Sequence, residues 1–166
     1  MRIKIAAVVF LVVFLAAWGA CNARLLAQTS APQPTPSPSP SPDPRTVWDG
    51  VYSDDQAKRG GSLYYGECAS CHGDNLKGNE STPALSGSDF AADWEGQTLG
   101  DLFKKIRRTM PQNEPGRLNQ QQDVDVLAYI LSFNKFPSGK TELPPDTDLL
   151  KLIRFQSVNP DTKKGN

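Results

Sequence analysis

Five consecutive residues constrain this chain more than any others: Cys68-Ala69-Ser70-Cys71-His72. Two thiols three residues apart, followed at once by an imidazole, predict a covalent haem attachment site. Each thiol can add to one vinyl group, and the histidine can then bind the iron. His72 is the only histidine among the 166 residues. If a haem is attached, its proximal nitrogen ligand is therefore already identified.

The same five residues are also compatible with half of a zinc site or with a redox dithiol. A structural zinc site needs four Cys or His ligands, but the chain after Ala27 offers only Cys68, Cys71 and His72. A thioredoxin-like dithiol follows a strand and opens a helix, whereas this motif comes at the end of a helical pattern. Haem attachment is favoured, and the other two uses stay open.

The N-terminal sequence is typical of an exported protein. Two positive charges precede an apolar run of about fourteen residues, Ile5 to Trp18. That run is shorter than the roughly 20 residues of a membrane span and fits a secretory signal. We expect residues 1–27 to be the signal and the mature protein to reach the periplasm. Cys21 offers lipidation as a second outcome, although the residue three positions before it is not the aliphatic one that lipoprotein signals favour.

Residues 28–45 are predicted to form a proline-rich, disordered linker. Proline occupies every second position from Pro32 to Pro44. Its locked φ and missing N–H exclude helix and sheet and leave a stiff polyproline-II spacer. Such a spacer would let a tethered domain reach its partners, and a low-complexity tail without a role is the alternative.

Residues 46–137 predict one small all-helical domain. At about 90 residues, such a domain buries a modest core and often needs a cofactor as an additional nucleus. Apolar residues at helical spacing follow three N-cap residues, Ser53, Thr98 and Asn119. The predicted helices span residues 54–67, 98–109 and 119–133. Residues 138–166 form a C-terminal extension, in which a short helix over 147–153 packs back on the domain through Leu149, Leu150, Leu152 and Ile153.

The distribution of charge bears on possible partners. The chain has 18 Lys and Arg against 18 Asp and Glu, and three of the basic residues precede Ala27, so the mature chain is mildly acidic. That balance gives no support for a nucleic-acid partner. Lys104, Lys105, Arg107 and Arg108 nevertheless gather on the second helix. They either steer an acidic redox partner or form an ordinary solvated face.

The sixth iron ligand is suggested by elimination. The chain has no second histidine, and Met1 lies in the signal, so Met110 is the only mature thioether. It lies 38 residues after His72, and Pro111 ends the helix there. A His/Met pair saturates the iron and raises its potential, which predicts electron transfer. Core packing is the ordinary alternative for a lone methionine.

Four motifs follow one another along residues 46–137: Gly60-x-x-x-Tyr64-x-x-x-Cys68-x-x-Cys71-His72-Gly73, Pro83-Ala84-Leu85-x-Gly87, Thr109-Met110-Pro111 and Val126-Leu127-Ala128-Tyr129-Ile130. Their order resembles the class I c-type cytochromes over nearly all of this range. The run from Trp94 to Pro137 is similar to small bacterial cytochromes c associated with quinoprotein dehydrogenases. The family implies a cytochrome c fold of three to five helices around one haem c, and Trp94 as a propionate donor or a plain core residue.

The resemblance also implies roles for individual residues. The carbonyl of Pro83 would accept the Nδ1–H of His72, leaving Nε2 for the iron. Gly60 would let the first helix approach the last one closely, near Ala128 and Tyr129. Four apolar residues would form the haem wall: Leu85, Leu99, Phe103 and Leu127.

Three functions fit these residues. The leading prediction is a periplasmic monohaem electron carrier without enzymatic activity, which accepts electrons from a quinoprotein dehydrogenase and passes them to a terminal oxidase. The first alternative is a haem enzyme or ligand-binding haem protein with a labile sixth position. The second is a haem-stabilised tethering module in which the linker matters more than the redox chemistry.

Overall fold

The computed structural model describes residues 45–163. The predicted signal over residues 1–27, Cys21 and all but the last residue of the linker over 28–45 lie outside this range. Among the described residues, none of the helices has the length and apolar character needed to cross a membrane.

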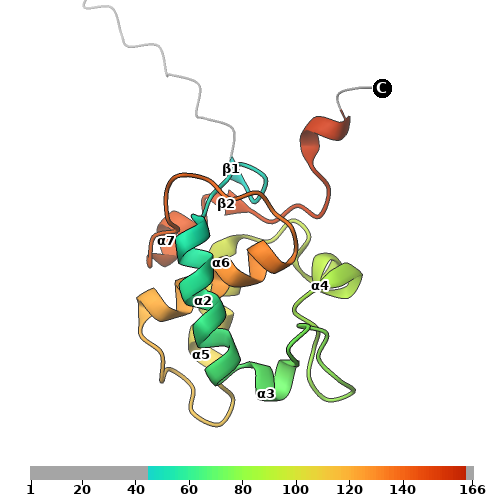
Figure 1. The fold of residues 1–166 in the computed structure, drawn as a ribbon. Coiled ribbons are helices and arrows are strands. Elements are labelled where there is room, and N and C mark those ends of the chain that lie inside the picture. The colour runs from blue at the N-terminus through green and yellow to red at the C-terminus, as the bar shows by residue number, and fades with distance from the viewer. Residues whose placement is uncertain (1–44, 164–166) are drawn as a thin grey trace, which may run out of the picture. The chain divides into compact units, whose positions relative to one another are not determined.

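The regular secondary structure of the described residues is helical apart from two very short strands (Figure 1). Four α-helices are longer than one turn, and two more have four residues each, which agrees with the predicted all-α class. The strands pair in parallel, Arg45 with Ile153 and Thr46 with Arg154. In order, the elements are β1 (Arg45–Thr46), α2 (Asp54–Glu67), α3 (Ala69–His72), α4 (Gly87–Trp94), α5 (Leu99–Thr109), α6 (Gln120–Phe133), α7 (Thr147–Leu150), β2 (Ile153–Arg154) and a 3-10 turn, η1 (Pro160–Lys163).

The three predicted helices α2, α5 and α6 begin at their predicted caps. Ser53 accepts a hydrogen bond from the first turn of α2. Thr98 and Asp101 form a reciprocal capping box at α5, and Asn119 and Gln122 form another at α6. The ends of these helices match the sequence prediction to within a residue because caps are local signals. No helix was predicted at α4.

Helices α2 and α6 cross at close range (Figure 1). Gly60 makes this possible, because a Cβ at that position would overlap the backbone carbonyl of Asp125 and lie 3.0 Å from the Cβ of Tyr129. The predicted contact with Tyr129 is therefore confirmed. The carbonyl of Asp125, which was not predicted, is the tighter neighbour.

The C-terminal segment, residues 138–163 of the described chain, is bound to α2 by hydrogen bonds and an ion pair. The side-chain amide of Gln56, fully buried, donates to the carbonyl of Leu143 at 3.0 Å and accepts from its N–H at 2.8 Å. Arg59 binds Asp125 of α6 at 3.0 Å and Glu142 at 2.8 Å. This segment is therefore continuous with the domain core.

Only half of the predicted packing by the C-terminal extension is correct. Leu150 and Ile153 are buried, whereas Leu149 and Leu152 are 50% and 62% exposed. The predicted helix over residues 147–153 is in fact a single turn, α7, followed by β2. One turn of helix can bury only one side against a neighbour, so Leu149 faces outward while Leu150 is buried, and Leu152 lies beyond the end of α7.

Candidate functional site

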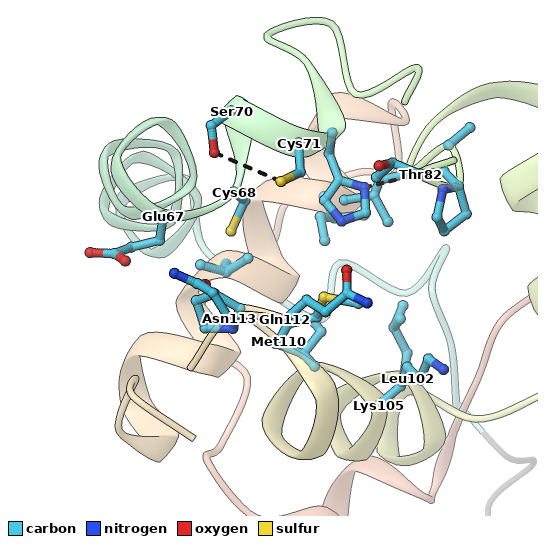
Figure 2. Close-up of a pocket in the computed structure, with 18 of the residues that line it drawn as sticks. Glu67, Cys68, Ser70, Cys71, Thr82, Leu102, Lys105, Met110, Gln112 and Asn113 are labelled. Carbon is cyan, nitrogen blue, oxygen red and sulfur yellow. Dashed lines mark hydrogen bonds between the residues drawn. The ribbon is translucent and has the colours of Figure 1, made fainter. Parts of the chain in front are cut away.

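A cavity of about 830 Å³ opens between the end of α2, α3 and α5. Cys68, Cys71 and His72 line it from one side, and Met110, directly after α5, lines it as well. Figure 2 shows the two cysteines facing Met110 across this space. The fold thus brings four residues, singled out in two separate stretches of sequence, to one cavity. Its volume lies within the range of cofactor pockets, about 300–1,000 Å³.

The junction of α2 and α3 places the two thiols. Cys68 ends α2, and its N–H donates to the carbonyl of Tyr64 at 2.8 Å. Cys71 and His72 then donate their N–H groups to the carbonyl of Cys68 at 3.1 and 3.0 Å. A single helical turn therefore presents both sulfurs and the imidazole together.

The pKa of the Cys68 thiol is raised to about 11, mainly by burial and then by the nearby carboxylate of Glu67. The attacking cysteine of a redox dithiol has a lowered thiol pKa, so Cys68 does not fit that role. Within residues 45–163, no three His, Cys, Asp or Glu side chains gather as a metal site would require.

His72 is buried, at 6% exposure, and its orientation is fixed by one hydrogen bond. Nδ1 lies 3.0 Å from the carbonyl oxygen of Pro83. Because a carbonyl oxygen only accepts, Nδ1 carries the proton, and Nε2 keeps its lone pair for a metal. This is the pairing that the resemblance to c-type cytochromes implied.

The loop behind His72 is tightly folded. Gly78 donates its N–H to the carbonyl of His72 at 2.9 Å. Its φ is +63°, and a Cβ there would overlap the carbonyl of Thr82 and lie 2.8 Å from the carbonyl of Pro83. The side chain of Asn79 donates to the carbonyl of Cys71 at 3.2 Å. The loop that leads to Pro83 is thus held against the helical turn that carries Cys71 and His72.

Met110 follows the last residue of α5. Its N–H donates to the carbonyl of Ile106 at 2.9 Å, while its own backbone is extended, with φ −125° and ψ 149°. The side chain is half-buried and lines the cavity. Residues 112–117, which follow, are all exposed.

The apolar lining of the cavity differs from the predicted haem wall. Leu85 lines the cavity as predicted, but Leu99, Phe103 and Leu127 are fully buried in the core without lining it. Helices α5 and α6 are each apolar on two neighbouring stripes, and the sequence prediction chose the stripe that packs away from the cavity. The stripes that line the cavity are Leu102 and Ile106 on α5, and Val126 and Ile130 on α6.

The cavity lining includes one predicted residue with a polar group and several that were not predicted to line it. Trp94, predicted as a propionate donor or a plain core residue, lines the cavity and packs against Phe90 with ring centroids 6.5 Å apart. Glu67 and Arg117 also line it and form an ion pair at 3.2 Å. Lys105 lies on α5 beside Met110 (Figure 2). No sequence signal could pair Glu67 with Arg117, because the two lie 50 positions apart.

The predicted basic cluster has three outward members rather than four. Arg107 turns toward Asp123 of α6, with 3.4 Å between Nε and Oδ2. Asp123 is 1% exposed, and neither of its oxygens has a hydrogen-bond partner among the described residues. Burial raises the pKa of Asp123 to about 6, and Arg107 opposes that rise. Lys104, Lys105 and Arg108 are exposed.

These residues fit a covalent haem. The cavity offers two thiols, an imidazole with Nε2 free, a thioether and apolar walls. Residues 55–130 match the family model described as "Cytochrome C oxidase, cbb3-type, subunit III". This match supports the class that the motifs predicted, a class I c-type cytochrome. A domain of this class binds haem c covalently and serves haem-based electron transfer with redox partners.

Comparison with solved structures gives a similar chain in the crystal structure of the sulfane dehydrogenase SoxCD from Paracoccus pantotrophus. The two share 20% sequence identity over 72% of this chain and 68% of that one, with a TM-score of 0.43. No curated protein matches the sequence.

Proposed function

We propose that this chain is an exported monohaem electron carrier whose iron is held between His72 and Met110. One observation carries the proposal: Cys68, Cys71, His72 and Met110 line the same cavity. The haem, when bound, supplies one-electron redox chemistry. Because His72 and Met110 would both bind the iron, the iron would offer no site for a substrate, so the chain is proposed to act as a carrier and not as an enzyme.

The chain's own residues prepare the site for this role. Pro83 holds the proton of His72 on Nδ1, which directs Nε2 to the metal. The thioether of Met110, as a soft ligand, favours the reduced state and raises the potential. The apolar lining from α5 and α6 limits water in the cavity. An environment with little water solvates charge poorly, so it would also favour the reduced haem, which carries the lower charge.

The surface near Met110 supports transient docking. Lys104, Lys105 and Arg108 are exposed on α5, and Lys105 also lines the cavity. Such a cluster would raise the encounter rate with acidic redox proteins. We propose a quinoprotein dehydrogenase as the donor and a terminal oxidase as the acceptor.

The rest of the chain would deliver this domain to its compartment. We propose that residues 1–27 are an export signal, that residues 28–45 are a spacer, and that the cytochrome domain of residues 46–137 carries the extension of residues 138–166. The mature protein would work in the periplasm, free or anchored through a lipid on Cys21.

The ligand set is tested by replacing Met110 with alanine, beside a Gln112→Ala control that also borders the cavity. Met110→Ala should abolish the thioether-to-iron charge-transfer band of the ferric protein and lower the reduction potential by on the order of 0.1 V or more. Gln112→Ala should change neither. A Met110→Ala protein with the wild-type spectrum and potential would show that another group fills the sixth position.

One observation keeps a second function in view. Residues 112–117 beside Met110 are exposed, and such a segment can open locally. A haem enzyme or ligand-binding haem protein would use that opening as its normal state. Such a protein should be high-spin in the ferric form at neutral pH, whereas the carrier should be low-spin.

A further inference from the structure

One ion pair joins the end of α2 to the methionine loop, which we define as residues 111–118. Glu67, the last residue of α2, immediately precedes Cys68, and Arg117 lies seven residues after Met110. The carboxylate and the guanidinium are 3.2 Å apart, and both residues line the cavity. The pair therefore bridges the two protein segments that would contact opposite sides of a haem.

The methionine loop, residues 111–118, has little else to hold it there. Its backbone hydrogen bonds stay within the loop or return to Met110, and the longest of them, from the Gly116 N–H to the Met110 carbonyl, measures 3.5 Å. Within residues 45–163, no other hydrogen bond or ion pair joins this loop to residues 66–72. Only Leu118, at the far end of the loop, is buried.

We propose that the Glu67–Arg117 ion pair is a latch that keeps the methionine loop closed and thereby sets how often Met110 leaves the sixth position. The inference rests on the proposed ligation of the iron by His72 and Met110. Glu67 and Arg117 are positioning residues, which act through the loop and do not touch the iron.

The expected size of the effect follows from the environment of the pair. The Glu67 side chain is 21% exposed and that of Arg117 is 50% exposed, so water screens the pair in part. A pair of this kind contributes at most about 1 kcal/mol, which corresponds to roughly a fivefold change in an opening equilibrium. The latch would therefore alter the lability of Met110 without abolishing its ligation.

The chain offers a matched control for this pair. Arg117 also lies 3.9 Å from Glu114, a 65% exposed residue of the same loop. Glu114→Gln removes an equal charge from the same arginine without touching the bridge across the cavity. Glu67→Gln and Arg117→Gln each remove the bridge, and the double variant tests whether both act through one interaction.

Two measurements on the haem-loaded protein test the latch. The first is the rate at which imidazole, largely neutral at pH 8, replaces the sixth ligand of the ferric form. The second is hydrogen exchange of the amides in residues 111–118. Glu67→Gln and Arg117→Gln should each raise the imidazole rate and the exchange rate, by up to about fivefold. Glu114→Gln should leave both rates unchanged, and the double variant should match the single ones.

Salt provides an independent check. Raising the ionic strength from about 0.01 M to 1 M shortens the screening length from about 30 Å to 3 Å. The imidazole rate of the wild type should therefore rise with salt toward that of Glu67→Gln, whose own rate should stay constant. If Glu67→Gln exchanges ligands and amides like the wild type, the latch is overturned.

Failure of the latch differs from failure of the ligand assignment. If the wild type shows no thioether-to-iron band, the proposed role of Met110 is wrong, and the latch as a regulator of iron ligation falls with it. If the band is present and Glu67→Gln leaves every rate unchanged, only the latch is wrong.

Discussion

The two protein segments on either side of the cavity are held in very different ways. The attachment segment, residues 68–87, is cross-linked by hydrogen bonds to its surroundings: Tyr64 donates to the Gly73 carbonyl at 2.7 Å, and Asn134 donates to the Leu85 carbonyl at 2.9 Å. The methionine loop, residues 111–118, bonds mostly to itself. Both segments contribute residues to one cavity, but only the first is fixed from several directions.

This difference assigns different freedom to the two proposed iron ligands. His72 is buried and held through Pro83 by a loop that is itself braced. Met110 stands at a helix end beside an exposed loop. Segments with few buried contacts open at low free-energy cost. We therefore expect the iron to keep His72 under conditions in which it loses Met110.

Substitution of one glycine in each segment tests most directly how differently the attachment segment and the methionine loop are held. Gly78 of the attachment segment and Gly116 of the methionine loop both have positive φ, at +63° and +81°. A Cβ at Gly78 would overlap the Thr82 carbonyl, whereas one at Gly116 would meet nothing closer than 4.0 Å. Gly78→Ala should lower the free energy of unfolding by about 3 kcal/mol, and Gly116→Ala by about 1 kcal/mol, the cost of the left-handed backbone alone.

Denaturant unfolding of the haem-loaded variants measures both values. Equal losses at the two positions would contradict the comparison, because they would show that the attachment segment yields as easily as the methionine loop.

The next largest predicted effect on the free energy of unfolding concerns a buried carboxylate, that of Asp123. Asp123 of α6 lies beside Arg107 of α5, the helix that Met110 directly follows. The charge of Asp123 also acts on Cys68 of the attachment segment. Its pKa rises from 3.8 to about 6 on folding, so the folded state favours the protonated form. The stability from this group is complete below about pH 4 and is lost as the pH rises through about 6.

Asp123→Asn should remove the loss of stability that the ionised Asp123 carboxylate causes at high pH. The variant should unfold with about 2 kcal/mol more free energy than the wild type at pH 8 and with a similar value at pH 4, as measured by denaturant unfolding at each pH. Asp125→Asn is the control, because Asp125 is buried but bound by Arg59 at 3.0 and 3.1 Å. That variant should be less stable than the wild type at pH 8. An Asp123→Asn protein destabilised at pH 8 would mean that Arg107 outweighs burial.

The sequence was sufficient for the features that depend on near neighbours. Ser53, Thr98 and Asn119 cap helices through residues three positions ahead, so the starts of α2, α5 and α6 were predictable. The same holds for the cysteines and His72 within one helical turn. Helix α4 was missed, since its eight residues depend on Phe90, whose ring lies 5.6 Å from that of Phe155.

The predictions that were wrong concern features that depend on contacts between distant segments. Both apolar stripes of α5 are buried, so periodicity could not show that Leu102 rather than Leu99 lines the cavity. Arg107 was assigned to an outward cluster because its neighbour Asp123 lies on another helix. Whether Trp94 serves a propionate and whether Met110 binds the iron remain predictions.

Adjacent tyrosines of α2 give a smaller and more local test. Tyr64 is fully buried, and its hydroxyl donates to the Gly73 carbonyl beside His72 at 2.7 Å. Tyr65 is 56% exposed, and its hydroxyl meets only that of Tyr129, at 3.4 Å. Tyr64→Phe should cost about 1 kcal/mol of unfolding free energy and speed amide exchange in residues 73–78, while Tyr65→Phe should cost less than about 0.5 kcal/mol. Unchanged exchange in Tyr64→Phe would remove this bond from the list of what braces the attachment segment.

The smallest predicted effect concerns the outer face of α5, next to the methionine side of the cavity. Lys105 is exposed and lines the cavity, whereas Lys140 is exposed in the C-terminal segment. If electrons leave on the side of the methionine loop, Lys105→Gln should slow oxidation of the reduced protein by anionic ferricyanide about twofold at low salt, and Lys140→Gln should not. A cationic cobalt complex should react with Lys105→Gln at least as fast as with the wild type, because the lost charge no longer repels it. Equal slowing by both substitutions would mean that net charge alone governs the encounter, and the weakly held side of the cavity would then have no special part in electron exit.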